Sequence, residues 1–184
     1  MYLFLLPLLT GFALNSTSAF TTFFSTRLGE RGSRLACILL RDVLGIPVWT
    51  IGYVMAVLSH SPNLFTSSLL SSILAWLLIL VGAAVIIAGM ISLRWRAVAP
   101  SVNDALVING LYAHIRHPLY SGMFLELIGL FLWFPSQSML VSCAIGVLWV
   151  FIQARLEEMD LLQRLPTYKE YMQRVPRFVP KLRG

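Results

Sequence analysis

One stretch of the chain, residues 69–93, contains no charged side chain over 25 positions. A helix needs roughly 20 consecutive apolar residues to cross a bilayer core about 30 Å thick, so this stretch predicts a membrane span. The rest of the chain agrees, because 58% of its 184 residues are hydrophobic and only 12% are charged. A soluble domain carries about 25% charged residues. The composition therefore excludes an ordinary soluble domain and a disordered chain.

Four further apolar runs predict four more spans, at residues 2–24, 43–58 (with a lead-in from residue 35), 118–134 and 139–153. The last two are separated only by residues 135–138, which predicts a tight antiparallel helical hairpin. The first run has an alternative interpretation as a cleaved signal, but no basic residue precedes it. Residues 156–172 mix apolar and charged side chains and predict an amphipathic helix on the membrane surface. We expect an all-α integral membrane protein with five transmembrane helices.

The positive charges indicate how these spans are oriented. With five spans, all 14 Lys and Arg residues fall on one side of the membrane, at positions 27, 31, 34, 41, 94, 96, 116, 155, 164, 169, 174, 177, 181 and 183. Cytoplasmic segments of membrane proteins are enriched in these residues. We therefore expect the N-terminus outside and the C-terminus in the cytoplasm. The net charge of +6 then reflects topology and contact with anionic lipids, and no nucleic-acid partner is expected.

Polar residues concentrate in two segments, 109–122 and 155–160. If the hairpin turn is centred near Ser136, residues equally far from it on either side lie at the same depth. Arg116 and His117 are then level with residues 155–158, at the cytoplasmic mouth of the hairpin. Both polar segments are therefore expected to meet there.

This mouth has the chemistry of a site for a charged ligand. Pro118 suits the first turn of a helix, where no N–H is needed, and it places His117 near the N-cap. The open N–H groups of that turn and Arg116 favour an anion, while Glu157 and Glu158 supply hydrogen-bond acceptors. The combination suits a zwitterion with a carboxylate, an ammonium group and a ribose diol. There are alternatives without a ligand. The basic residues can be interfacial anchors in the sense that they only hold the chain at the membrane surface, and the acidic pair can be a solvated helix end.

Glu126 is a further candidate because of its depth. Leu119, Gly122, Met123 and Glu126 share one helix face, on which Gly122 leaves a hole. Glu126 lies about 12 Å beyond Pro118 along the helix. A carboxyl group near the middle of a bilayer is costly and is a functional candidate by default, although it can also be a protonated packing residue. The two cysteines, Cys37 and Cys143, lie in apolar runs, and the three histidines lack ligand spacing, so no metal site is expected.

Several short motifs taken together resemble one known family. They are Leu-Val-Ile-Asn-Gly-Leu-Tyr at 106–112, Arg-His-Pro-Leu-Tyr-Ser-Gly at 116–122, Glu-Glu at 157–158, and the tail residues Tyr168, Tyr171, Val175, Arg177, Phe178 and Pro180. This pattern resembles the isoprenylcysteine carboxyl methyltransferase family, and phospholipid N-methyltransferases share it. The resemblance covers about residues 105–180. It departs from the family at residues 165–167, Leu-Pro-Thr, where Phe-Gly is usual.

The resemblance implies a membrane methyltransferase that uses S-adenosylmethionine. It implies cofactor binding by Gly110, Tyr112, Arg116, His117, Pro118, Tyr120, Gly122, Glu157 and Glu158. We expect Arg116, Glu126 and Glu158 to take part in catalysis. Residues 101–184 would then form the cofactor-binding core, and residues 1–100 would form three spans that shape the substrate entrance.

The acceptor is expected to be lipophilic and to enter from the bilayer. Carboxyl O-methylation of a prenylated thiol compound is the first hypothesis, and N-methylation of a phospholipid or S-methylation of a thiol is the alternative. An ionised carboxylate needs no base, whereas a protonated amine needs one, and Glu126, His114 and His117 are the candidates. Two hypotheses from other classes are an NADPH-dependent enzyme similar to sterol reductases and a non-catalytic membrane module.

Overall fold

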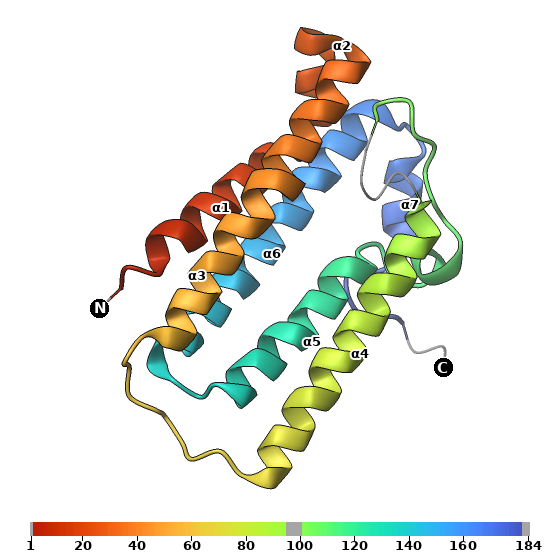
Figure 1. The fold of residues 1–184 in the computed structure, drawn as a ribbon. Helices are drawn as coiled ribbons and strands as arrows, with labels where there is room; N and C mark the ends of the chain where they lie inside the picture. The colour runs from red at the N-terminus through yellow and green to blue at the C-terminus, as the bar shows by residue number, and fades with distance from the viewer. Residues whose placement is uncertain (1, 95–100, 182–184) are drawn as a thin grey trace.

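The computed structural model describes residues 2–94 and 101–181, and its elements there are all helical. In chain order they are α1 (Leu5–Thr17), α2 (Thr21–Ile38), the π-helix η1 (Leu39–Gly45), α3 (Ile46–Leu58), α4 (Leu69–Leu93), the 3-10 helix η3 (Gly110–Ala113), α5 (Pro118–Trp133), α6 (Gln137–Arg164) and α7 (Tyr168–Arg174). Figure 1 shows the long helices side by side. The all-α class predicted from the sequence is confirmed.

Within the described residues, three helical stretches are long and apolar enough to cross a membrane: Thr21–Leu58, Leu69–Leu93 and Gln137–Arg164. The other two apolar helices, α1 and α5, have 13 and 16 residues. At 1.5 Å per residue they are about 20 and 24 Å long, shorter than a bilayer core of about 30 Å. The long apolar helices make the chain a membrane protein, whereas α1 and α5 are too short to span a bilayer core of that thickness as straight helices.

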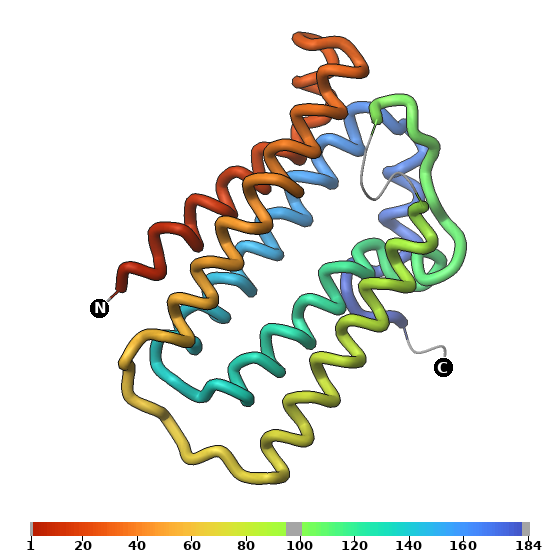
Figure 2. The backbone as a smooth tube through the Cα atoms, viewed as in Figure 1, coloured from red at the N-terminus to blue at the C-terminus, as the bar shows by residue number. Residues whose placement is uncertain are grey.

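The first predicted span, residues 2–24, was too long. Helix α1 ends at Thr17, and residues from Thr21 onward belong to α2. The chain then reverses at Gly29, whose φ of 70° is easily adopted only by a residue without a side chain. The Ser33 hydroxyl donates to the Thr21 carbonyl oxygen at 3.1 Å and so ties the two limbs of α2 together. Figure 2 shows this reversal at the upper end of the molecule.

The second predicted span contains Pro47, and a proline inside a helix usually causes a kink or needs a neighbour that satisfies the freed carbonyl. The structure instead has the π-helix η1 directly before the proline, and the Ile46 N–H donates to the Arg41 carbonyl oxygen five residues back. A proline ring crowds the carbonyl four residues earlier and offers no N–H. The wider π-turn accommodates this clash without ending the helix, which continues through α3.

Helix α5 packs against α4 through small residues. A Cβ on Gly122 would lie 2.5 Å from the Gly82 carbonyl oxygen, and a Cβ on Gly82 would lie 2.7 Å from the Gly122 carbonyl oxygen. Glycines let two backbones approach this closely, which is how helices associate in lipid. The predicted hairpin of α5 and α6 does have a short connection, residues 134–136. The two helices are in contact at mid-length, where a Cβ on Gly146 would lie 3.2 Å from the Leu127 side chain, and a cavity lined by both helices adjoins this contact.

Helices α1, α3 and α6 form the other half of the molecule. The rings of Phe12 and Trp149 stack with their centroids 4.3 Å apart. The Tyr53 hydroxyl donates to the Ser142 carbonyl oxygen at 3.2 Å, which joins α3 to α6. The two halves, α1–α3–α6 and α4–α5, therefore face each other across the space that holds the candidate site.

The C-terminal part differs from the sequence prediction in its boundaries. Helix α6 continues to Arg164, beyond the expected end of the span at residue 153. The amphipathic segment predicted over 156–172 is thus divided between the end of α6 and the short helix α7, with Pro166 between them. Tyr168 and Tyr171 are the buried residues of α7.

Candidate active site

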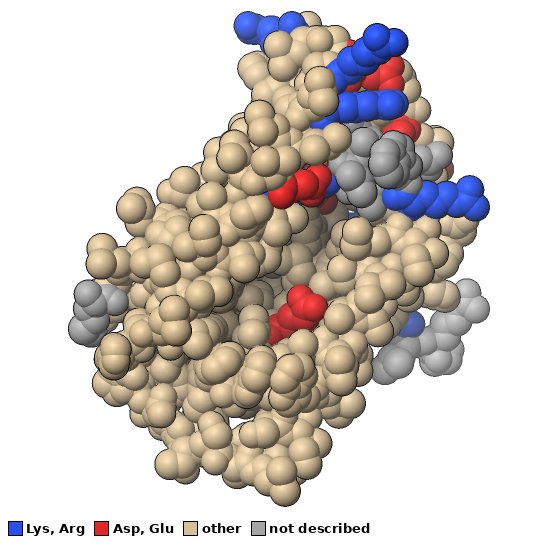
Figure 3. All heavy atoms as spheres, in the orientation of Figure 1, with Lys and Arg blue, Asp and Glu red and all other residues tan. Residues whose placement is uncertain are grey.

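Two cavities lie between the halves of the molecule. The first, called here the polar cavity, has a volume of about 490 Å³. Its polar lining residues are Asn15, Ser18, Thr21, Arg41, Asp42, Asp104, Tyr112, Arg116, His117, Tyr120, Glu126, Glu157, Asp160, Arg164, Tyr168 and Tyr171. Figure 3 shows a hollow on one face of the molecule, with acidic side chains in it.

The second, called the apolar cavity, has a volume of about 420 Å³. Its apolar lining includes Phe12, Tyr53, Val54, Val57, Leu127, Leu130, Phe134 and Met139. Trp49, Met123, Glu126 and Trp149 line both cavities, so the two spaces adjoin. A polar space and an apolar space thus meet at one small set of side chains.

The two predicted polar segments do come together, next to the polar cavity. The Arg116 guanidinium lies 3.0 Å from Glu158 Oε1, and His117 Nε2 lies 3.2 Å from the same oxygen. The Tyr120 hydroxyl hydrogen-bonds Glu157. The predicted meeting of the proline-started end of α5 with the acidic pair of α6 is confirmed, and residues 116–120 lie level with 157–158.

Glu158 is fully buried and its carboxylate is occupied by protein groups. Besides Arg116 and His117, it accepts two hydrogen bonds from the guanidinium of Arg177, one of them at 3.1 Å. The side chain has no exposed surface and lies behind the cavity wall. Glu158 therefore joins α5, α6 and the C-terminal segment to one another.

Arg116 is also held by the C-terminal segment. One of its terminal nitrogens donates to the Met172 carbonyl oxygen at 2.7 Å and to the Val175 carbonyl oxygen at 3.2 Å. Its backbone N–H donates to the Pro176 carbonyl oxygen at 2.8 Å. Most donors of Arg116 are thus used inside the protein, although its side chain still contributes to the cavity wall.

Glu157 has a different position from its neighbour. Its side chain is 35% exposed and lines the polar cavity. One carboxylate oxygen accepts from the Tyr120 hydroxyl and from the Gln153 amide at 3.2 Å, and the other lies 3.8 Å from His117 Nδ1. Glu157 is therefore the member of the acidic pair that can reach a ligand.

The C-terminal segment closes the site on one side. The His117 N–H donates to the Arg177 carbonyl oxygen at 3.0 Å, and the Ser121 hydroxyl donates to the Phe178 carbonyl oxygen at 2.7 Å. The Tyr171 hydroxyl donates to the Tyr112 carbonyl oxygen at 2.6 Å. Burial raises the pKa of Tyr171 to about 12, so its hydroxyl stays protonated and remains a donor at neutral pH.

The remaining predicted residues lie in different places. Gly110 has a φ of 58° and is the first residue of η3, and a Cβ there would lie 2.7 Å from Ser92 Oγ. Pro118 is fully buried at the first turn of α5. Gly122 contacts α4 and leaves no hole toward a cavity. His114 is exposed. These glycines and the proline shape the backbone near the site.

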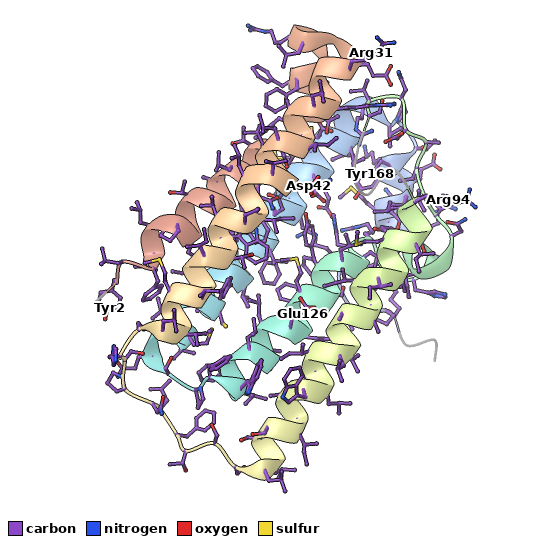
Figure 4. The ribbon with its side chains drawn as sticks, viewed as in Figure 1. Tyr2, Arg31, Asp42, Arg94, Glu126 and Tyr168 are labelled. Atoms are coloured by element: carbon purple, nitrogen blue, oxygen red, sulfur yellow. The ribbon has the colours of Figure 1, made fainter. Side chains whose placement is uncertain are left out.

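Glu126 lies where the two cavities adjoin. Figure 4 labels it on α5, facing the space between the helices. Among residues 2–94 and 101–181, no group hydrogen-bonds or ion-pairs with its carboxyl group. The described residues that line the apolar cavity include no Lys, Arg, His or Asp. Glu126 is the one Glu among them, in a wall that is otherwise uncharged.

A model of the phospholipid methyltransferase family matches residues 70–169, more than half of the chain. The chain belongs to this family. The family match supports the broader relationship that the motifs indicated, and it does not separate carboxyl from phospholipid methyltransferases. A stretch of 83 residues is 31% identical to the cobalt-zinc-cadmium resistance protein CzcN of Cupriavidus metallidurans and covers 44% of this chain. It covers 38% of that relative, and no solved structure matches the chain.

The region that matches the family contains most residues of the candidate site. The matched region runs from α4 into α7 and includes Arg116, His117, Glu157 and Glu158. Sequence reasoning assigned no site role to Arg177, although it belongs to the tail motif. Sequence reasoning also overlooked Asn15 and Trp49, which line the cavities from outside the matched region. Asn15 begins a short polar stretch, residues 15–18, that is equally typical of a helix end, and Trp49 lies among mostly apolar residues, so neither position signals a site.

Proposed function

We propose that the chain is a membrane-embedded methyltransferase that transfers a methyl group from S-adenosylmethionine to a lipid acceptor. The observation that carries this proposal is the junction of a polar and an apolar cavity at Trp49, Met123, Glu126 and Trp149. A charged methyl donor and a lipid chain need such different surroundings. The family supports the reaction type.

The polar cavity suits the methyl donor by size and by chemistry. Its volume of about 490 Å³ falls within the range of roughly 300–1,000 Å³ that is typical of small-molecule sites. Glu157 would accept hydrogen bonds from an ammonium group or a ribose diol, because part of its carboxylate is exposed to the cavity. When bound, S-adenosylmethionine supplies a methyl group on a sulfonium, which an acceptor lone pair displaces directly.

The chain's own residues would act mainly by positioning. Arg116, His117 and Glu158 hold α5, α6 and the C-terminal segment together, and Tyr120 fixes the Glu157 carboxylate. Fixed polar groups and exclusion of water are the main contributions an enzyme makes to such a transfer. In this proposal Glu158 and Arg116 are positioning residues, and Glu157 contacts the donor.

The acceptor would enter from the bilayer with its chain in the apolar cavity. Glu126 then faces its reacting group. An amine acceptor must lose a proton, and the Glu126 carboxyl group, which has no partner in the described part of the chain, can take it. A carboxylate acceptor, as in the isoprenylcysteine enzymes, would be placed beside a second carboxyl group, which is unfavourable when both are ionised. Glu126 therefore favours an acceptor that must lose a proton, such as an amine, over a carboxylate.

We further propose that α1 and α5 also cross the bilayer, giving five transmembrane passes with the N-terminus outside. The side chains of Lys and Arg gather at one end of the face seen in Figure 3. The polar cavity lies toward that end, which would be cytoplasmic by the positive-inside rule. The first three spans would shape the entrance for the acceptor.

The test is transfer of a labelled methyl group by the purified chain in nanodiscs. Three lipid acceptors are compared: phosphatidylethanolamine, S-farnesyl-N-acetylcysteine and a long-chain thiol. We expect S-adenosylmethionine-dependent labelling, strongest for the amine. Labelling of none of them, together with no thermal stabilisation by S-adenosylhomocysteine, would overturn the proposal. Stabilisation by NADPH alone would favour a reductase, and stabilisation by neither ligand would favour a non-catalytic module.

A further inference from the structure

The wall of the cavities formed by α1, η1 and α3 contains polar groups that the proposed donor site does not use. Asn15 is only 5% exposed and lines the polar cavity. Its side-chain amide makes no hydrogen bond to any residue in the described parts of the chain. A buried amide without a partner is costly, so such a group in a cavity wall points to a ligand.

A second group without a partner lies on the same wall. The indole N–H of Trp49 is buried and has no hydrogen-bond acceptor among residues 2–94 and 101–181. Trp149, across the cavity, differs, because its indole N–H donates to the Ser16 hydroxyl at 3.0 Å. Trp49 lines both cavities, so its N–H lies near the junction where a lipid head group would pass into its chain.

Arg41 adds a positive charge to this wall. It lies in η1, lines the polar cavity and pairs with Asp42 at 2.9 Å. Its guanidinium is close enough to Glu157 and Tyr120 to interact with them electrostatically. The donor side of the cavity and Arg41 therefore face a common space.

The helices hold these groups in place. A Cβ on Gly45 would lie 3.1 Å from both Asn15 Cβ and Asn15 N, so α1 and η1 are in close contact at this level. The Trp49 ring packs edge-on against Tyr53, with centroids 5.9 Å apart. Two neutral N–H donors and a guanidinium on fixed elements form a preorganised receptor for negatively charged oxygen atoms.

We propose that Asn15, Trp49 and Arg41 form a subsite for an oxyanionic group, a phosphate or a carboxylate, on the lipid acceptor. This subsite rests on the proposed function, because it takes the acceptor to be a lipid bound across the junction. All three residues precede position 70, where the family match begins, so the subsite would belong to the N-terminal half of this chain. It would select acceptors by a group that is separate from the bound donor.

The test measures binding of short-chain lipids to the full chain in detergent. The probes are dioctanoyl phosphatidylethanolamine, which carries a phosphate, S-farnesyl-N-acetylcysteine, which carries a carboxylate, and dioctanoylglycerol, which carries neither. We expect one of the two probes that carry an oxyanionic group to bind at least tenfold more tightly than dioctanoylglycerol. The stronger of the two identifies the source of the oxyanion. Equal binding of all three would overturn the subsite.

Three variants then test the residues. Trp49→Phe removes the N–H and keeps a ring, Asn15→Leu removes the amide, and Arg41→Gln removes the charge. Each should weaken binding of the preferred anionic probe about tenfold. Stabilisation by S-adenosylhomocysteine should remain, which also shows that the variants are folded. If one of the other variants does not fold, the conservative variant Trp49→Phe is a sufficient test. Unchanged probe affinity of Trp49→Phe would overturn the subsite.

Matched control variants remove comparable polar groups away from the cavities. They are Trp76→Phe on α4, Thr17→Val at the end of α1, and Arg34→Gln, whose guanidinium pairs with Glu30. None should change probe binding, and an equal loss in the controls would overturn the assignment. Methyl transfer separates the two proposals. Transfer with unchanged acceptor KM in the three variants defeats the subsite alone, and residue-dependent probe binding without any transfer defeats the proposed function alone.

Discussion

The guanidinium of Arg177 binds both carboxylate oxygens of Glu158, across 19 positions of sequence. This contact brings the C-terminal segment back to α6 at the level where α5 begins. Arg116 and His117 approach the same carboxylate from α5. One buried side chain thus joins three parts of the chain around the candidate site, and its partners are all cationic groups or hydrogen-bond donors.

Glu158→Gln should therefore destabilise the protein strongly. Removing one partner of a buried ion pair typically costs about 3–5 kcal/mol, because the remaining charges lose their compensation. Thermal unfolding in detergent measures this effect. Glu170→Gln is the matched control, since its pair with Arg174 is 3.7 Å long and about three-quarters exposed. Equal unfolding temperatures for the Glu158 variant and the parent would contradict the joining role.

Glu157→Gln should behave differently, with weakened donor binding and little change in stability. Glu157 is partly exposed to the polar cavity, and the loss of a charge-assisted hydrogen bond weakens binding about tenfold to a hundredfold. The dissociation constant of S-adenosylhomocysteine measures it. Glu30→Gln, a carboxylate outside both cavities, serves as the control. An unchanged dissociation constant would show that the donor does not contact Glu157.

The sequence predicted the meeting of Arg116 and His117 with the acidic pair, because two helices joined by a short turn must return to the same depth. It did not predict the role of Arg177, since nothing local identifies a distant carboxylate as its partner. It also assigned α5 to α6 as its packing neighbour. In lipid both faces of a helix are apolar, so hydrophobicity does not reveal that Gly122 packs on α4.

The missed polar wall has a similar explanation. Asn15 lies at the polar end of α1 and Trp49 in an apolar helix, and only the fold shows that their polar side-chain groups lack partners among residues 2–94 and 101–181. The predicted spans place a connection after residue 24, but the sequence does not identify Gly29 as its turning point, because a glycine does not by itself indicate a positive φ. Local patterns thus predicted helices and the charged site, whereas partners between distant helices required the structure.

Gly122→Ala tests the close approach of α5 to α4. The new methyl group would lie 2.5 Å from the Gly82 carbonyl oxygen and 2.6 Å from the Ile86 side chain, so the helices must separate. Overpacking of this kind costs about 1–3 kcal/mol. Thermal unfolding should show the loss, whereas Ala84→Leu on the exposed face of α4 should have no effect. A fully stable Gly122 variant would mean that the two helices are not in contact at this point.

Tyr171→Phe tests how the C-terminal segment is held. The lost hydrogen bond to Tyr112 should cost about 1 kcal/mol at pH 8. Burial raises the pKa of Tyr171 to about 12, above the value of about 10 for an unfolded chain. A pKa raised by folding stabilises the protein below pH of about 10, and this contribution is lost as the pH rises toward 12. The parent's advantage over the variant should therefore shrink between pH 8 and pH 11 in thermal unfolding, and a constant difference would contradict this role.

Glu126→Gln should reduce transfer to an amine acceptor without unfolding the protein. The glutamine keeps the size of the side chain but cannot take a proton, and loss of a general base lowers kcat about a hundredfold or more. Donor binding should persist, because the variant leaves the groups around Glu157 in place. A carboxylate acceptor needs no base, so S-farnesyl-N-acetylcysteine is the internal control, and its transfer should not fall. An equal loss with both acceptors would indicate that Glu126 shapes the cavity and does not move a proton.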